Sequence, residues 1–492
     1  MRGMHVHLIG VAGTGMGALA GLLKAAGHRV SGSDVAFYPP MGEALTRWGI
    51  ETKTGHLPEH LEPRPDLVIV GNVCRKDNPE ARAAIDGGLR YASMPGALED
   101  LFLRDRPSFV VAGTHGKTTT TTLTAVLLHA LGKDPGLLVG GIPLDFGESF
   151  RVGASDAPFV IEGDEYDSAF FEKTPKFWRY APNAAILTSI EHDHVDIYPS
   201  LESYLAAFTE FVRRIPEDGV LVAFAGDPLV REVAKGARCR VVFYALSTDD
   251  VGDTLPVWTA APIAPSGGAQ PFDLFVGGTF ACNVLSPLSG DHNVRNAIAA
   301  IALVCETSGG TIPVTDPVRA LRAFRGVKRR QELRGEARGV RVYDDFAHHP
   351  TAVRETLAGL RARHPEGRLL AAFEPRSATA CRKLHEEGYK DAFYSADLTV
   401  LAPLGRMNIP DAERMDLREV ARGLEARGKE AVTPASLDEV LATLVREAKA
   451  GDTIVLMSNG DFGNLHPRLL AALATGRLEA RPLAPAGAEA KA

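Results

Sequence analysis

A glycine-rich loop between an apolar run and a threonine-rich run is the feature that most constrains the fold of this chain. The apolar run Phe-Val-Val-Ala occupies residues 109–112, the loop occupies residues 113–118, and the threonine-rich run leads on to Leu131. Backbone amides in such a loop and at the start of the following helix bind phosphate oxygens, a lysine adds a positive charge, and a threonine hydroxyl suits Mg²⁺. The order of strand, loop and helix therefore predicts a phosphate-binding loop with ATP as its ligand. The residues expected to hold ATP are Gly113, Thr114, His115, Gly116, Lys117, Thr118 and Thr119.

The spacing of this loop departs from the general pattern. Residues 113–118 follow Gly-x-x-Gly-Lys-Thr, which is shorter than the general Gly-x-x-x-x-Gly-Lys-Ser/Thr. The alternative is a glycine turn that carries Lys117 on the surface. The complete order of strand, loop, Lys-Thr pair and helix start favours the phosphate loop.

Length and composition indicate a cytoplasmic, multidomain globular protein. A chain of 492 residues is expected to form about three domains. A net charge of -7 argues against general attraction to nucleic acid or to anionic membranes. The five cysteines show no Cys-x-x-Cys spacing, which favours reduced thiols and a cytoplasmic location. Residues 6–23 are apolar but fit a strand, turn and helix better than a signal peptide, and no stable membrane association is expected.

Short apolar runs alternate with helical patterns along the chain, which predicts three α/β domains. Residues 1–105 are expected to form a Rossmann-like domain, residues 106–322 a central P-loop ATPase-type domain, and residues 323–476 a second Rossmann-like domain. Residues 249–278, rich in Pro, Gly, Ala and Thr, predict a β-rich or loop insertion. The Ala/Pro-rich residues 477–492 predict a disordered tail.

A second glycine-rich turn crosses from strand to helix at residues 10–17. Asp34 ends the next expected strand about twenty residues later, as in dinucleotide-binding folds. Such a turn binds any pyrophosphate, so NAD, FAD and a UDP-sugar all remain possible ligands, as does a turn without a ligand. The candidate UDP-sugar-binding residues are Gly10, Ala12, Gly13, Thr14, Gly15, Met16, Ser33, Asp34 and Asn72.

Two acidic segments follow apolar strands in the central domain. The run at residues 159–162 ends in Glu162, our first choice of Mg²⁺ ligand, and Glu165 is the second. The segment at residues 189–196 alternates histidine and acidic residues; one short cluster rarely completes a zinc site, so a second Mg²⁺ contact at His194 is favoured. A solvated acidic loop is the alternative for both segments.

Polar residues also mark a helix start and several strand ends further along the chain. Asn293 and Asn296, next to His292, either cap a helix or contact a purine edge, and capping is favoured when they are considered alone. In the third domain, positively charged and histidine side chains at strand ends are suited to bind carboxylate or phosphate groups. The third-domain candidates are Arg329, Arg330, Asp345, His348, Arg376, Ser458 and Asn459.

In this order, the segments resemble the Mur ligase family over nearly the whole chain. The resemblance rests on the glycine turn at residues 10–17 and on residues 113–122, 162–170, 191–198, 290–296 and 343–351. It implies three domains, which bind a UDP-muramyl substrate, ATP, and an incoming amino acid or peptide. It also implies that Glu162 and the run Asp193-His194-x-Asp196 bind Mg²⁺, that residues 292–296 contact adenine, and that Arg329, Arg330 and Asp345 meet the nucleotide.

Two differences within the family indicate the incoming substrate. Members that add glutamate, diaminopimelate or the terminal dipeptide carry a carbamylated lysine in a region where residues 204–212 of this chain contain no lysine. This places the chain beside the branches that add alanine or a tripeptide. The runs at residues 165–170, 345–349, 374–377 and 457–462 resemble the tripeptide-adding branch. Alanine-adding members typically have Tyr-Gly before the paired histidines, where this chain has Phe346 and Ala347, and Gln-Pro-His-Arg where it has Glu-Pro-Arg-Ser at residues 374–377.

The resemblance therefore implies ATP-dependent joining of UDP-N-acetylmuramate to L-alanyl-γ-D-glutamyl-meso-diaminopimelate through an acyl phosphate, in peptidoglycan recycling. Lys117, Glu162 and His194 are the expected catalytic residues, and Thr118, Glu162 and His194 are the expected Mg²⁺ ligands. The alternatives are addition of L-alanine in peptidoglycan synthesis, a nicotinamide dehydrogenase, and a non-catalytic UDP-sugar-binding protein gated by a nucleotide. The sequence leaves the oligomeric state open.

Overall fold

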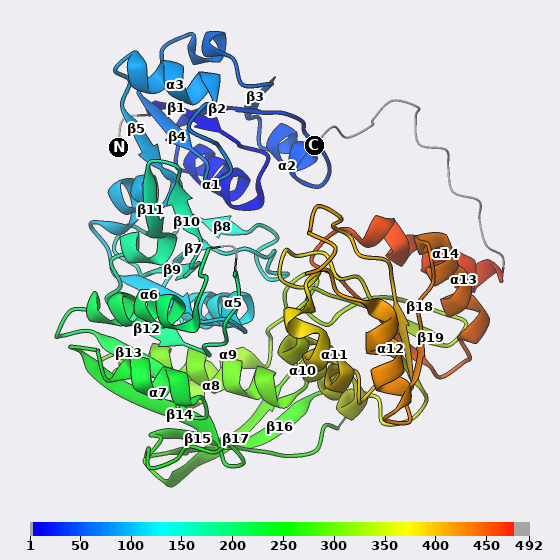
Figure 1. Ribbon diagram of the computed structural model, residues 1–492. Coiled ribbons are helices and arrows are strands. Elements are labelled where there is room, and N and C mark those ends of the chain that lie inside the picture. Colours follow the sequence, from blue (N-terminus) through cyan, green and yellow to red (C-terminus); the bar gives the residue numbers. More distant parts are fainter. Residues whose placement is uncertain (1–2, 196, 267, 477–492) are drawn as a thin grey trace. The chain divides into compact units, whose positions relative to one another are not determined.

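The computed structural model describes residues 3–195, 197–266 and 268–476 (Figure 1). Asp196 and the predicted tail at residues 477–492 therefore lie outside the described residues. The chain divides into two compact units, Met1–Lys328 and Arg329–Ala492. Figure 1 colours the first unit from blue to green and the second from yellow-green to red. Each unit is an α/β structure built on parallel strands, which confirms the predicted fold class.

The first unit begins with a five-stranded parallel sheet of order β3-β2-β1-β4-β5. Its strands are β1 (His5–Ile9), β2 (Arg29–Asp34), β3 (Glu51–Thr54), β4 (Leu67–Val70) and β5 (Tyr91–Ser93). Its helices are α1 (Thr14–Ala25), α2 (Met41–Arg47), η1 (Pro58–Leu61), α3 (Pro79–Asp86), α4 (Met94–Leu98) and the π-helical turn η2 (Glu99–Leu103). The strand order reverses between β1 and β4, and ligands of such sheets bind at the carboxyl ends beside that point. The predicted strand, turn and helix at residues 6–23 are present as β1 and α1.

A ten-stranded sheet of order β17-β16-β15-β14-β13-β12-β6-β9-β7-β8 forms the rest of the first unit. Its strands are β6 (Ser108–Ala112), β7 (Gly136–Leu138), β8 (Phe150–Arg151), β9 (Phe159–Glu162), β12 (Ala184–Leu187), β13 (Val220–Phe224), β14 (Arg240–Leu246), β15 (Trp258–Pro262), β16 (Gln270–Val276) and β17 (Thr279–Ser286). A separate hairpin pairs β10 (Asp167–Ala169) with β11 (Glu172–Pro175). The helices are α5 (Lys117–Ala130), η3 (Lys176–Arg179), α6 (Leu201–Arg213), α7 (Pro228–Ala234), α8 (Asp291–Glu306) and α9 (Thr315–Leu321).

The order of this sheet positions the predicted site. Strand β6 lies between β9 and β12 and is parallel to both. The phosphate loop, the acidic segment at Glu162 and the His/acid segment near His194 each follow one of these strands. The three segments therefore meet at one edge of the sheet, although up to about 80 residues separate them in the chain. The sequence predicts either a β-rich or a loop insertion at residues 249–278. The segment contains β15 and β16, so it is β-rich.

Helix α5 is buried along most of its length in spite of its threonines. The Thr122 hydroxyl donates to the Thr118 carbonyl at 2.8 Å, and the Thr124 hydroxyl donates to the Thr120 carbonyl at 2.9 Å. Bonds of this kind satisfy a hydroxyl inside the helix itself, so the side chain can be buried. The helix can therefore pack against α8 and the sheet while its first turn stays at the phosphate loop.

The second unit is a six-stranded sheet of order β18-β19-β23-β20-β21-β22, in which only β18 is antiparallel to its neighbour. The strands are β18 (Glu332–Ala337), β19 (Val340–Asp345), β20 (Leu369–Phe373), β21 (Leu398–Leu401), β22 (Glu430–Val432) and β23 (Thr453–Met457). The helices are α10 (Pro350–Arg363), η4 (Lys383–His385), α11 (Glu386–Ala392), α12 (Leu417–Glu425), α13 (Leu437–Glu447), η5 (Phe462–Asn464) and α14 (Leu465–Thr475). Two separate hydrophobic clusters include side chains of this sheet, one with α10, α11 and α12 and the other with α13 and α14. This is the doubly wound arrangement that the sequence predicts.

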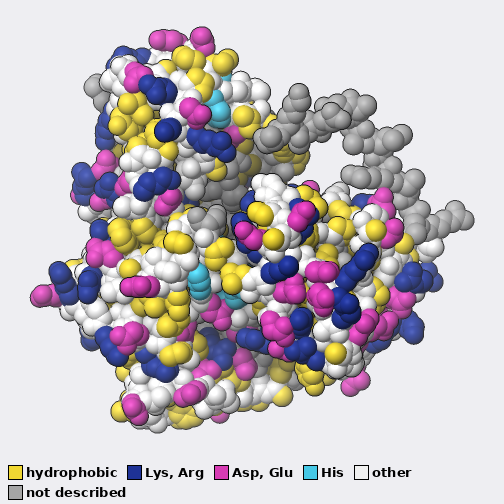
Figure 2. Space-filling view, viewed as in Figure 1, with side chains coloured by type: hydrophobic (Ala, Val, Ile, Leu, Met, Phe, Trp, Pro, Cys, Tyr) yellow, Lys and Arg dark blue, Asp and Glu magenta, His cyan; other side chains and the backbone are white. Residues whose placement is uncertain are grey.

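The surface carries charges of both signs. On the face shown in Figure 2, Lys and Arg side chains are interspersed with Asp and Glu side chains. Among the described helices, none is both long enough and apolar enough to cross a membrane.

Candidate active site

The phosphate loop is a tight turn that depends on two glycines. Gly113 has φ 130° and Gly116 has φ 80°, a region of backbone conformation that favours glycine. A Cβ atom on Gly116 would lie 2.5 Å from Asn296 Oδ1, and one on Gly113 would lie 2.2 Å from Thr188 Oγ1. Gly116 is the N-cap of α5 and has no side chain to cap it. The N-terminus of α5 can therefore face an anion, whereas the Thr114 and His115 amides of the loop donate to Ser189.

Two expected ligands of Mg²⁺, the Thr118 hydroxyl and the Glu162 carboxylate, lie in contact. The Thr118 hydroxyl donates to Glu162 Oε1 at 2.8 Å, and the Gly140 amide donates to Glu162 Oε2 at 2.7 Å. Mg²⁺ prefers oxygen ligands and usually takes only a few from the protein. A hydroxyl and a carboxylate held together at the start of α5 fit this ion, and the assignment of Thr118 and Glu162 to it stays a prediction.

Glu165, the second choice of Mg²⁺ ligand, lies inside the protein. Its side chain is 1% exposed, and it forms ion pairs with Lys117 and His194. Burial by itself raises the pKa of Glu165, but the charges of Lys117 and His194 and their hydrogen bonds outweigh burial and lower the pKa to about 2. The alternative of a solvated acidic loop is therefore wrong for this residue.

His194 lies beside Glu165 in a strained backbone conformation, with φ 53°. Its Nε2 is 3.2 Å from Glu165 Oε1, and its Nδ1 is 3.0 Å from the Tyr166 hydroxyl. Burial lowers the pKa of His194, but the hydrogen bond and charge of Glu165 and the charge of Asp193 raise it above its ordinary value. The structure thus brings together Lys117 and His194, two of the predicted catalytic residues, on one carboxylate.

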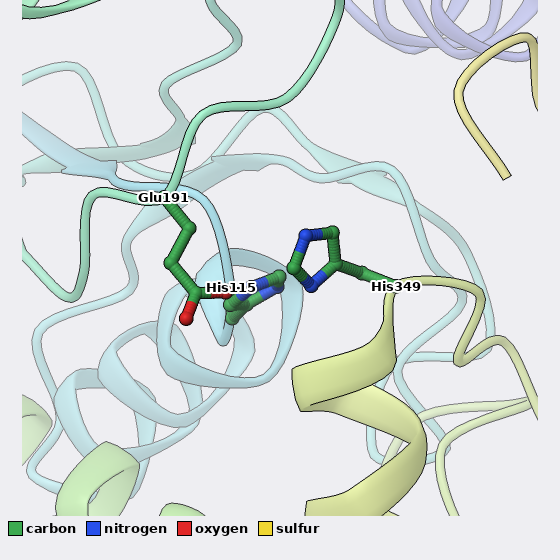
Figure 3. A group of neighbouring side chains, drawn as sticks. All are labelled: His115, Glu191 and His349. Carbon is green, nitrogen blue, oxygen red and sulfur yellow. Dashed lines mark hydrogen bonds and ion pairs between the residues drawn. The ribbon is translucent and has the colours of Figure 1, made fainter. Parts of the chain in front are cut away.

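His115 connects the phosphate loop to the His/acid segment after β12. Figure 3 shows the His115 ring beside the Glu191 carboxylate, and the two side chains approach to 2.6 Å between Nε2 and Oε2. Thr114 adds two further bonds between the same segments: its hydroxyl donates to the Glu191 carbonyl and accepts from the Glu191 amide. His349, the third residue drawn, belongs to the second unit, where it accepts a hydrogen bond from the Thr351 amide as the N-cap of α10.

The asparagines of α8 do not cap their helix. The capping role that the sequence favours for Asn293 and Asn296, considered alone, is therefore wrong. Gly290 is the N-cap and forms no side-chain cap. Asn293 Nδ2 donates to the Ser289 carbonyl at 2.8 Å, and Asn296 Oδ1 accepts from the Thr120 hydroxyl at 3.1 Å. Asn296 therefore joins α8 to α5 directly behind Gly116. Contact of His292, Asn293 and Asn296 with adenine stays a prediction.

The N-terminal glycine turn lies at the carboxyl ends of β1 and β2. The Gly10 and Val11 amides donate to the Ser33 carbonyl, and the Ala12 amide donates to Asp34 Oδ2 at 2.9 Å. The turn residues Gly13, Thr14 and Gly15 and also Asn72 are exposed, whereas Met16 and Ser33 are buried. Among the candidate UDP-sugar residues, the Met16 and Ser33 side chains therefore support the turn from inside the domain.

A buried carboxylate beneath this turn was not predicted. Glu80 Oε2 accepts from the Ser33 hydroxyl at 2.6 Å, and Glu80 Oε1 lies 2.7 Å from His7 Nε2. Two further histidines, His56 and His60, approach the same carboxylate at 3.4 and 3.7 Å. Burial raises the pKa of Glu80, but hydrogen bonds from His7 and Ser33 and nearby imidazole charges outweigh burial and lower it. His56 and His60, four residues apart, are the sequence signal for this cluster.

Replacing Glu80 should destabilise the first sheet. We expect Glu80→Ala to lower the free energy of opening of β1, measured by hydrogen exchange, by about 3 kcal/mol, because buried His7 loses its partner. The exposed Glu59, mutated to Ala, is the matched control and should change this value by less than about 0.5 kcal/mol. Because the Glu80 pKa is lowered, the stabilisation is complete above about pH 4.3 and is lost as the pH falls further. Equal exchange in both variants at pH 7 would contradict this role.

In the second unit, Asp345 organises the loop after β19. Its Oδ2 accepts from the Gln331 amide at 2.7 Å and its Oδ1 accepts from the Ala347 amide at 2.8 Å. The neighbouring Asp344 forms ion pairs with Arg329 and His466. Burial raises the pKa of Asp344, but the hydrogen bond and charge of His466, with the nearby arginines, lower it. Arg329 and Asp345 are thus tied into the fold, and their contact with the nucleotide stays a prediction.

Two of the four predicted peptide-binding residues, Ser458 and Arg376, contact Glu374. The Ser458 hydroxyl donates to Glu374 Oε2 at 2.5 Å, and Arg376 Nη1 lies 3.5 Å from Glu374 Oε1 and 3.3 Å from Asp461. Asn459 Oδ1 is buried and accepts no hydrogen bond from the described residues. Glu374 itself was not among the predicted site residues. His348 lies in the loop before α10, where its carbonyl accepts from the Tyr389 hydroxyl.

Comparison with known proteins decides the family. Residues 5–106 match the Mur ligase family, catalytic domain; residues 111–304 match the Mur ligase middle domain; and residues 329–460 match the Mur ligase, glutamate ligase domain. The chain belongs to the Mur ligase family. Mur ligases are ATP-dependent enzymes that form amide bonds, so this chain is an ATP-dependent ligase, and the dehydrogenase and non-catalytic alternatives are excluded.

Three Mur ligases show how similar the relatives are. The UDP-N-acetylmuramate–L-alanyl-γ-D-glutamyl-meso-2,6-diaminoheptandioate ligase of Escherichia coli is 39% identical over 96% of this chain and 98% of its own length. A UDP-N-acetylmuramate–L-alanine ligase of Roseiflexus is 36% identical over 93% of this chain and 97% of its own length. The crystal structure of a murein peptide ligase from Psychrobacter arcticus has a TM-score of 0.69 and 36% identity, and covers 96% of this chain and 99% of that one. The resemblance to Mur ligases is thus confirmed.

Proposed function

We propose that this Mur ligase joins UDP-N-acetylmuramate to L-alanyl-γ-D-glutamyl-meso-diaminopimelate, in peptidoglycan recycling. The observation that carries the proposal is the contact between residues 374–377 and residues 457–462, two of the third-domain segments that resemble the tripeptide-adding branch. Ser458 and Asp461 of one segment bond to Glu374 and Arg376 of the other. The Arg376 side chain is 42% exposed, which leaves it accessible to a carboxylate of a peptide.

The reaction requires an activated acid, because a carboxylate is a poor electrophile. An oxygen of the muramyl carboxylate attacks the γ-phosphoryl group of ATP, and ADP leaves. The α-amine of the tripeptide then attacks the carbonyl carbon of the acyl phosphate, and phosphate leaves from the tetrahedral intermediate. Lys117, held at the phosphate loop, would stabilise charge on the transferring phosphoryl oxygens.

Thr118, Glu162 and His194 would hold Mg²⁺ in this scheme. The ion would neutralise the phosphate oxygens beside the muramyl carboxylate. Its proposed ligands lie at the start of α5, at the end of β9 and in the segment after β12. Movement of the units is expected during turnover, since the amine donor and the nucleotide are assigned to different units and must come within attack distance.

Addition of free L-alanine is the second candidate, favoured by the 36% identity to the Roseiflexus ligase. The two functions differ in the size and charge of the amine donor. An alanine site has to bind one carboxylate, whereas the tripeptide carries several charged groups. The exposed Arg376 beside buried Glu374 is better suited to the larger donor.

Product analysis separates the two candidates. The enzyme is incubated with UDP-N-acetylmuramate, MgATP and equal concentrations of L-alanine and the tripeptide, and the products are weighed by mass spectrometry. We expect the tripeptide adduct as the dominant product, formed with equimolar ADP and phosphate. An alanine adduct as the dominant product would contradict the proposal and support the second candidate.

A further inference from the structure

Glu165 is the centre of a buried network in the first unit. Lys117 Nζ lies 3.0 Å from Oε2 and 3.3 Å from Oε1, and His194 Nε2 lies 3.2 Å from Oε1. The Tyr204 hydroxyl donates to Oε1 at 3.2 Å, and the Tyr198 hydroxyl donates to the Glu165 carbonyl at 2.6 Å. Backbone and side chain of Glu165 are thus both fixed, and a single carboxylate holds two of the proposed catalytic residues.

The Lys117 ammonium group is directed back toward its own loop. It donates to the Gly113 carbonyl at 2.5 Å, approaches the Thr114 carbonyl at 3.4 Å, and reaches Glu165. An ammonium group has three N–H donors, and these three partners occupy them. To bond to a phosphate oxygen, Lys117 has to give up at least one of these partners.

The environment of Glu165 differs from that of Glu162. Glu162 accepts hydrogen bonds from a hydroxyl and a backbone amide, both neutral donors that a cation can replace. Glu165 is bound by His194 and by the Lys117 ammonium, and a metal ion placed on Glu165 would face the positive charge of Lys117. Tyr204 also connects Glu165 to the loop, because its hydroxyl lies 3.1 Å from Thr114 Oγ1. These contacts suit a residue that positions the loop.

We propose that Glu165 is a positioning residue which keeps Lys117 turned back until a triphosphate displaces it, so that Glu165 and ATP compete for the same ammonium group. The competition rests on the proposed function, in which the phosphate loop binds ATP. Glu165 therefore weakens the binding of ATP. In return it keeps His194 in a fixed position for phosphoryl transfer, which a free histidine would reach only part of the time.

The test measures ATP affinity without Mg²⁺, so that metal binding does not contribute. The Kd of ATP in the presence of EDTA is measured by calorimetry for the wild type, Glu165→Gln, Glu165→Asp and Asp167→Asn. We expect Glu165→Gln to bind ATP about tenfold more tightly, and Glu165→Asp, which keeps the charge but shortens its reach, about threefold more tightly. Asp167 is the matched control, because its carboxylate bonds to Lys173 at 2.8 Å, and its variant should bind as the wild type does.

Kinetics supply the second readout. Glu165→Gln should lower the KM for ATP at saturating Mg²⁺ while its kcat falls about tenfold or more, a split that general destabilisation does not produce. If Glu165→Gln fails to fold, Glu165→Asp carries the test.

Three results would overturn the proposal. Weaker or unchanged ATP binding by either Glu165 variant would mean that Glu165 does not compete for Lys117. Tighter binding by Glu165→Gln with unchanged binding by Glu165→Asp would indicate that the negative charge of Glu165 simply repels ATP. A wild type that binds no ATP at all would contradict the nucleotide site itself, so failure of the proposed function is distinguishable from failure of this inference.

Discussion

Lys117→Ala should lower kcat for ligation by about 10³-fold, the size of effect seen when a main stabiliser of transition-state charge is removed. Burial lowers the pKa of Lys117, but Glu165, Asp164 and Glu162 raise it above its ordinary value, so the ammonium group stays charged across the physiological range. The variant loses this charge beside the transferring phosphoryl group. Release of ADP with UDP-N-acetylmuramate and the tripeptide measures the effect.

The UDP-sugar site supplies an internal control for this variant. The glycine turn at residues 10–15 belongs to another sheet, so the Kd of UDP-N-acetylmuramate should change by less than about twofold. Lys133→Ala is the matched substitution, because Lys133 is an exposed lysine just beyond the end of α5, and it should leave kcat unchanged. Full ligase activity of Lys117→Ala would overturn the assignment of the phosphate loop.

Glu162→Ala should have the second large effect. Removal of the carboxylate that contacts the Thr118 hydroxyl should lower kcat by about 10²- to 10³-fold and raise the Mg²⁺ concentration needed for half-maximal activity. The Mg²⁺ dependence is the informative measurement, because a variant that only misfolds loses activity at every concentration.

The neighbouring Asp167→Asn tests whether any acidic residue of this segment would give the same result. Asp167 forms an ion pair with Lys173, whose side chain is 65% exposed, and lies beyond the strand end that bears Glu162. Its variant should keep the Mg²⁺ dependence of the wild type. An unchanged Mg²⁺ dependence in Glu162→Ala would remove this residue from the metal site.

Local patterns predicted the parts of the fold that depend on short segments. The apolar runs before residues 113 and 163 form β6 and β9, and the glycine turn at residues 10–17 joins β1 to α1 as expected. Helix α5 begins at Lys117, where the loop pattern places it. These features could be predicted because strand burial, glycine turns and helix starts are set by neighbouring residues.

Side-chain partners far apart in the chain could not be predicted in the same way. Glu165 meets Lys117 across 48 positions and Asn296 meets Thr120 across 176. The sequence placed Glu165 in a possible Mg²⁺ site and Asn296 at a helix cap because each was judged beside its neighbours alone. Glu80 gave no local signal, since its importance depends on histidines of β1 and of the segment near η1.

Isotope transfer tests the central claim most directly. UDP-N-acetylmuramate labelled with ¹⁸O in the muramyl carboxylate is turned over with ATP and the tripeptide, and the released phosphate is analysed by mass spectrometry. Attack of that carboxylate on the γ-phosphoryl group predicts one ¹⁸O atom in each phosphate released. Phosphate without ¹⁸O, formed alongside the amide product, would show that the acid is not activated as an acyl phosphate and would contradict the account.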